Sequence, residues 1–172
     1  AATALVMPPN SSISNINFAT DTIRFYLAAT GPPATFVAGH NQYGDLAKTD
    51  YYNYSGSNTH IQGVYLGFGR AVASNSTNTF NVVVLDGTGG IPGTALGSTT
   101  LSYKTVADSI AAGTFVQYVP LGNISLPASN EFFVGVSFTY GADTIALLTN
   151  TIGETTPNTA WEQWGDLSWH PY

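Results

Sequence analysis

The sequence predicts an all-β protein, a two-sheet antiparallel β-sandwich with a jelly-roll-like arrangement. Short runs of residues alternate between apolar and polar with a period of two, which is typical of strands that bury one face. These runs are rich in β-branched and aromatic residues. Stretches rich in glycine and proline, such as residues 31–33 and 86–93, separate the runs at the short spacing of a sandwich.

The strands follow one another along the whole chain, and only residues 106–112 suggest a helical turn. The expected strands are residues 13–18, 22–27, 35–37, 61–68, 80–85, 99–103, 114–119, 132–140, 144–149 and 159–164. No internal repeat or linker divides the 172 residues. We therefore expect a single β-sandwich domain over residues 1–172, with residues 1–9 as a candidate for a donated N-terminal strand.

Two of these strands carry more specific information. In residues 80–85, apolar side chains occupy both faces, which predicts a central strand covered on both sides. In residues 61–68, Val64, Leu66 and Phe68 share one face. Gly63 and Gly67 lie on the other face, where we expect a partner backbone or a flat ligand to approach closely.

The composition excludes several classes of function. The net charge is −6 with only four Lys and Arg, so no basic patch is available for nucleic acid or for anionic membranes. No apolar run is long enough to span a bilayer, so we expect no membrane insertion. Charged residues make up only 8% of the chain, and such a weakly repelling surface suits contact with copies of the chain or with neutral polymers.

The chain has no cysteine, which removes disulfides, thiolate nucleophiles and cysteine-based zinc sites. Small residues at positions 1–4 resemble the end left by signal-peptide cleavage. We therefore expect an extracellular or cell-surface protein.

Four segments together resemble a known kind of module. They are residues 39–48 (GHNQYGDLAK), 85–93 (LDGTGGIPG), 133–136 (FVGV) and 161–164 (WEQW). The set resembles secreted β-sandwich surface modules of Bacteroidetes, which often occur beside a type IX secretion sorting domain. The resemblance covers most of the chain from about residue 40, and it brings no catalytic residues with it. It implies a secreted protein from which the sorting domain is removed during export.

The resemblance also implies O-glycosylation, because in that phylum glycans are attached within an Asp-[Ser/Thr]-aliphatic pattern. The candidate acceptors are Thr22, Ser109 and Thr144. About one such triplet arises by chance in a chain this rich in Ser and Thr. Sequons for N-glycosylation begin at Asn10, Asn53, Asn75 and Asn123 and matter only in a host that uses them.

Large aromatic residues gather at the C-terminal end: Trp161, Trp164, Trp169 and Tyr172. Such rings stack on sugars, so they are candidates for carbohydrate binding; packing in a core or at a subunit contact is the alternative. The alternation of residues 159–164 places Trp161 and Trp164 on opposite faces, so these two rings do not form one platform.

The first residues are short, apolar and uncharged, and a proline pair ends them. Ala4, Leu5, Val6 and Met7 form the candidate assembly strand. An exposed edge of this kind invites aggregation unless a sheet takes it up, and we expect a neighbouring copy to do so by strand addition. The alternative is an ordinary first strand of the same sandwich.

The remaining polar residues give weaker signals. Residues 51–54 (YYNY) are expected in a loop or at an edge, as a binding surface or as an anchor. Asp86, Asp45 and Asp50 could supply oxygen ligands to calcium, although aspartate is also a common turn residue. His40, His60 and His170 lack the spacing of metal ligands.

No catalytic motif is present in the sequence. It lacks the nucleophile elbow, the zinc-protease pattern and a phosphate-binding loop. A glycosidase pair, or a triad of His40 with Asp45 or Asp50, stays formally open. We expect no enzyme and no resident cofactor, but a structural subunit that assembles with copies of itself into a surface fibre or layer. The alternative is a carbohydrate-binding or adhesive module of a larger secreted protein.

Overall fold

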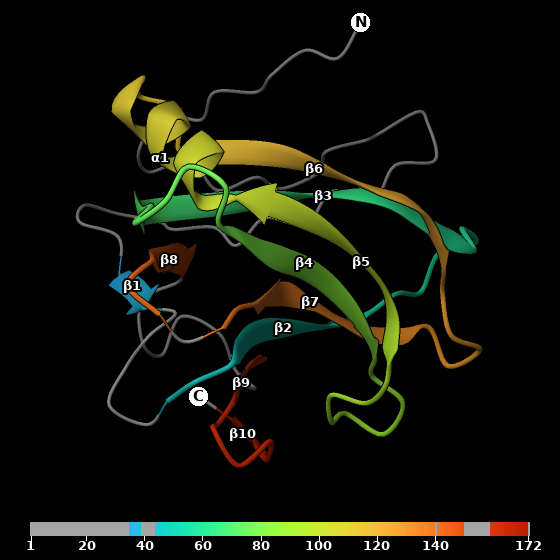
Figure 1. Ribbon diagram of the computed structural model, residues 1–172. Coiled ribbons are helices and arrows are strands. Elements are labelled where there is room, and N and C mark those ends of the chain that lie inside the picture. Colours follow the sequence, from blue (N-terminus) through green and yellow to red (C-terminus); the bar gives the residue numbers. More distant parts are fainter. Residues whose placement is uncertain (1–34, 39–43, 140, 150–158, 172) are drawn as a thin grey trace, which may run out of the picture.

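The computed structural model of the chain is a sandwich of two antiparallel sheets, which confirms the predicted fold class (Figure 1). The structure describes residues 35–38, 44–139, 141–149 and 159–171. The expected strands at 13–18 and 22–27 lie outside these residues. So do the candidate assembly strand Ala4, Leu5, Val6 and Met7, the acceptor Thr22, and Tyr172.

The four-stranded sheet has the order β1-β8-β3-β6. Its strands are β1 (Thr35–Ala38), β8 (Thr144–Thr149), β3 (His60–Val72) and β6 (Val116–Ser125). All of its pairs are antiparallel. Among the described residues, no strand pairs with the outer edge of β6.

The six-stranded sheet has the order β10-β9-β2-β7-β4-β5. Its strands are β10 (Trp169–Pro171), β9 (Ala160–Gln163), β2 (Ala47–Asn53), β7 (Glu131–Ser137), β4 (Thr79–Asp86) and β5 (Ala95–Ser102). It too is antiparallel throughout.

The strand β2 corrects one sequence expectation. Residues 51–54 were expected in a loop or at an edge, but β2 is an interior strand between β9 and β7. The sequence did not indicate this strand, because the polar residues Lys48 and Thr49 are both buried, on opposite faces of the sheet. The alternation of apolar and polar residues is therefore lost, although the strand is fully paired.

The helix α1 (Tyr103–Ala111) is longer than the single turn expected over residues 106–112. Ser102 caps its start, since the hydroxyl accepts a hydrogen bond from the Thr105 N–H. Buried Tyr103 and Val106 anchor it at one end of the sandwich (Figure 1). No described helix has the length and hydropathy needed to cross a membrane.

The core lies between the two sheets, and β3 and β4 behave as their sequences predict. Val64, Leu66 and Phe68 of β3 meet Phe80, Val82 and Val84 of β4 across it. On the outer face of the six-stranded sheet, Val83 and Leu85 join Phe133 in a second apolar cluster. The strand β4 is therefore covered on both faces, as expected for a central strand.

The glycines of β3 do not leave an open strip. A β-carbon at Gly63 would lie 2.4 Å from the Tyr118 hydroxyl oxygen, and one at Gly67 would lie 3.2 Å from Cβ of Leu148. The chain's own side chains therefore cover both glycines. The expectation that a partner or a flat ligand approaches there is wrong.

Candidate functional site

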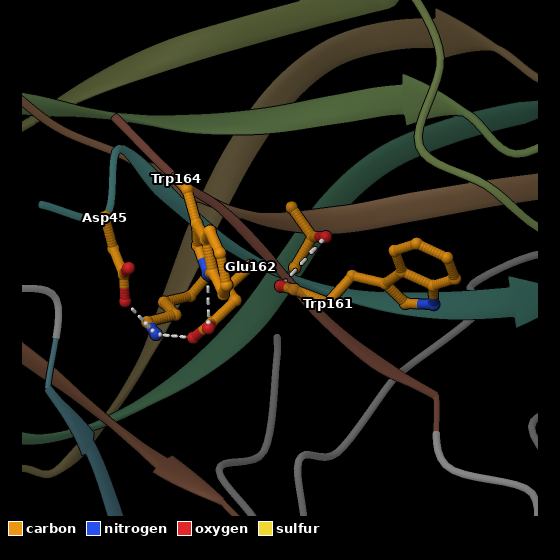
Figure 2. Close-up of polar contacts among 6 residues, drawn as sticks. Asp45, Trp161, Glu162 and Trp164 are labelled. Carbon is orange, nitrogen blue, oxygen red and sulfur yellow. Dashed lines mark hydrogen bonds and ion pairs between the residues drawn. The ribbon is translucent and has the colours of Figure 1, made fainter. Parts of the chain in front are cut away.

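Three places gather chemically distinctive side chains: a buried charge cluster on β2 and β9, an aromatic cluster on the outer face of the six-stranded sheet, and an exposed apolar row on β6. The charge cluster and one tryptophan of the aromatic cluster appear in Figure 2.

The charge cluster consists of Asp45, Lys48 and Glu162. Lys48 and Glu162 are directly opposite each other in the β2–β9 pair. The Lys48 Nζ contacts both Asp45 Oδ2 and Glu162 Oε2. All three residues are buried, with 0%, 4% and 7% of Asp45, Lys48 and Glu162 exposed. Buried charges of this kind persist only where partners satisfy them.

A tryptophan completes this cluster from the side. The Trp164 indole N–H donates a hydrogen bond of 2.7 Å to Glu162 Oε1, as Figure 2 shows. The opposite face of the strand carries Trp161, whose ring points away from the cluster. This confirms the expectation that Trp161 and Trp164 do not share a platform.

The two carboxyl groups of the cluster differ in acidity. Burial raises the pKa of Asp45 above its usual value, and the hydrogen bond and charge of Lys48 offset this only in part. Burial also acts to raise the pKa of Glu162. Hydrogen bonds from Lys48 and Trp164 outweigh that effect and hold the pKa of Glu162 below its usual value.

The aromatic cluster joins two of the predicted tryptophans and a residue that the sequence did not single out for this role. Trp161, Trp169 and Tyr51 are half-buried and pack around Val83, Leu85 and Phe133. The Trp161 ring meets the Phe133 ring edge to face, with ring centroids 6.2 Å apart. The Tyr51 ring is tilted against the same Phe133 ring, with centroids 5.2 Å apart. This apolar support orients three aromatic side chains on one sheet face.

Polar groups border the aromatic cluster. The Tyr51 hydroxyl donates to Glu131 Oε1 at 2.5 Å, and this hydrogen bond lowers the pKa of Glu131. Gln163 is the last residue of β9, two residues after Trp161, and its amide donates to the Leu167 carbonyl at 3.1 Å. Carboxylate and amide groups beside aromatic rings are the combination that recognises sugar hydroxyls.

The turn after β9 holds a second arrangement, in which the Trp164 ring stacks on His170 with centroids 3.6 Å apart. Ser168 Oγ contacts both Asp166 Oδ1 and His170 Nε2. In a hydrolase triad the imidazole stands between serine and carboxylate, and here the serine stands in the middle. This order suits a turn, with Leu167 at a φ of +72°.

The apolar row lies at the edge of the four-stranded sheet, over the residue just before β6 and the first residues of β6. Phe115, Val116 and Tyr118 are 46%, 49% and 49% exposed. The Tyr118 ring tilts against Tyr65 of β3, with centroids 5.1 Å apart. The alternation of residues 114–119 predicts a strand but not an edge strand, because a strand's place in its sheet depends on pairings between distant residues.

The calcium candidates are engaged in other contacts. Asp86 Oδ1 accepts from the N–H and hydroxyl of Thr88 at 2.8 and 2.7 Å, as a turn aspartate does. Asp50 accepts from Tyr52 and from the Tyr51 N–H. Within the described part of the chain, no three His, Asp or Glu side chains gather as metal ligands would.

The glycan candidates that the structure describes are both half-buried. Ser109 is on α1, where its hydroxyl donates to the Thr105 carbonyl at 3.0 Å. Thr144 begins β8 and is opposite Val72.

Comparisons of the chain with protein-family models, with curated proteins and with solved structures found no match.

Proposed function

We propose that the chain is a non-enzymatic extracellular structural subunit that assembles with copies of itself at the edge of the four-stranded sheet. The observation that carries this proposal is the exposed apolar row on an edge strand: Phe115, Val116 and Tyr118 of the β6 segment. Exposed edges of this kind readily accept another strand, and most soluble proteins protect them with charge. None of the three residues is charged.

The strand that best fits this edge is residues 1–7 of a neighbouring copy. Those residues are apolar and uncharged, like the row they would cover. Pro120 has no N–H to offer, so strand addition would be confined to the part of β6 before it. Each buried aliphatic side chain of the donated strand would contribute about 1.5–3 kcal/mol before ordering costs.

The composition agrees with a subunit that depends on contacts with other copies of the chain. With 8% charged residues and no cysteine, the chain has little charge repulsion and no disulfide to hold it together. The resemblance of four of its segments to secreted Bacteroidetes surface modules supports an extracellular setting.

Deleting residues 1–7 tests the proposal. We expect the full chain to form fibres or layers under negative-stain electron microscopy, and the truncated chain to stay folded and monomeric. Normal assembly by the truncated chain would overturn strand donation.

A second candidate function, carbohydrate binding, is favoured by the aromatic cluster of Tyr51, Trp161 and Trp169. These residues share one face and are half-exposed beside polar groups. In this reading, Trp164 belongs to the buried charge cluster and not to the sugar site.

A further inference from the structure

Lys48 is a buried amine between two carboxyl groups. It comes from the interior strand β2, and only 4% of it is exposed. Its Nζ touches one oxygen of Asp45 and one of Glu162. With every group ionised the cluster would carry one positive and two negative charges, a net charge of −1. A buried cluster avoids such a net charge by taking up one proton.

Asp45 is the carboxyl group of the cluster that takes up a proton more readily. Burial raises the pKa of Asp45, whereas hydrogen bonds from Lys48 and Trp164 keep the pKa of Glu162 low. With that proton on Asp45, the cluster would hold an uncharged carboxylic acid, an ammonium group and a carboxylate base in mutual contact. An uncharged acid is a far better electrophile than a carboxylate, and a carboxylate can take a proton from the amine.

We propose that Lys48 and Asp45 condense into an internal amide bond, with Glu162 as the catalytic base. Glu162 takes a proton from the Lys48 ammonium, and the free amine attacks Cγ of Asp45. The Nζ–Cγ bond forms, the Cγ–OH bond breaks, and the hydroxyl leaves with a second amine proton as water. The ammonium, the acid and the carboxylate thus become the amide, one water and protonated Glu162, with no oxidant or reductant.

Burial drives this condensation. In water an ammonium and a carboxylate are too well hydrated to condense, but inside the sandwich both charged forms lose that hydration. The neutral amide has no such cost. Exclusion of water from the site also slows the reverse reaction.

The neighbours of Glu162 favour Asp45 as the electrophile. The Trp164 indole occupies Oε1 of Glu162, which leaves Oε2 facing the amine. Asp45 is only three residues before Lys48, so the new bond closes a small ring at the start of β2. In a chain that has no cysteine for disulfides, this bond would be a covalent cross-link at the start of an interior strand.

Intact mass spectrometry of chain produced in a host that adds no glycans tests the bond. The wild-type chain should be lighter than its sequence by one water, about 18 Da. Glu162→Gln, which removes the base but keeps the shape, should have its full sequence mass. Asp45→Asn should lose ammonia instead and reach the same final mass as the wild-type chain, which supplies a readout if Glu162→Gln does not fold.

Trypsin supplies the matching control, because it does not cleave after an acylated lysine. Wild-type digests should contain a peptide of residues 25–70, and Asp45→Ala digests should instead contain 25–48 and 49–70. A wild-type chain at full mass would overturn the proposal. So would an Asp45→Ala chain that still loses water, because the bond would then involve Glu162.

Discussion

Lys48 faces Glu162 directly across the β2–β9 pair, and its ammonium group contacts both that carboxylate and Asp45. This pairing explains how a lysine can be buried in a sandwich whose core is mostly apolar. It also fixes β9 to β2, and through β9 it fixes the C-terminal strand β10. The cluster therefore connects the order of the sheet to the placement of the tryptophans.

The close contact of β7 with β2 makes Gly135 irreplaceable. A β-carbon there would lie 1.9 Å from the Lys48 carbonyl oxygen and 2.6 Å from Cα of Thr49. We expect Gly135→Ala to lower the free energy of unfolding by about 3 kcal/mol, at the upper end of overpacking costs. Gly141→Ala is the control, since no atom lies within 4 Å of its β-carbon. Urea unfolding that showed equal effects for both variants would contradict this packing.

Asp50 should make stability fall as pH rises. Burial raises its pKa above 3.8, so the folded state keeps a proton that the unfolded state has already released. The stability contributed by Asp50 is thus full below pH 3.8 and is lost as pH rises through the folded pKa. Asp50→Asn has no such titration, so its stability relative to wild type should increase over that range. A difference that stays constant across pH in urea unfolding would refute this.

Sugar binding, if the aromatic cluster supports it, should depend on Trp161. Trp161→Ala removes a ring from the outer face, and we expect affinity for a neutral glycan to fall about tenfold. Phe115→Ala removes an exposed ring on the other sheet and should leave the affinity unchanged. Calorimetry with a panel of neutral polysaccharides measures both, and the absence of heat with every glycan would remove this second candidate.

Glycans should add mass to residues 1–172 when they are expressed in an organism that glycosylates such acceptors. We expect an intact mass above the 18.1 kDa of the chain, with the excess reduced by Ser109→Ala or Thr144→Ala. The physical reason for expecting glycans is that they would keep a surface with few charged residues soluble. A mass no greater than 18.1 kDa would show that neither position is modified.

The sequence predicted the strands whose alternation follows burial, and it missed those whose pattern is set by specific partners. Val64, Leu66 and Phe68 are buried on one face as predicted, because an apolar side chain needs only the core. The strand β2 was missed because the polar side chains of Lys48 and Asp50 point inward, where specific partners satisfy them. No local pattern can indicate that Lys48 will meet Glu162, 114 residues away.

The candidate sites show the same division. The alternation of β9 correctly separated Trp161 from Trp164, since period two is a local property. The residues that cluster with Trp161 are Tyr51, Phe133 and Trp169. Which residues come together there depends on the order of the strands in the sheet, so it could not be predicted from the sequence. The exposed edge of β6 likewise depends on which strands pair.

Light scattering of three chains across a range of concentrations tests self-assembly at β6 most directly. Val116→Lys places a charge on the exposed apolar row, and Val72→Lys places the same charge at an exposed valine of β3, away from that row. We expect wild type and Val72→Lys to grow into large assemblies with concentration, and Val116→Lys to remain monomeric. A wild-type chain that stays monomeric at every concentration, or a Val116→Lys chain that assembles like wild type, would contradict assembly at this edge.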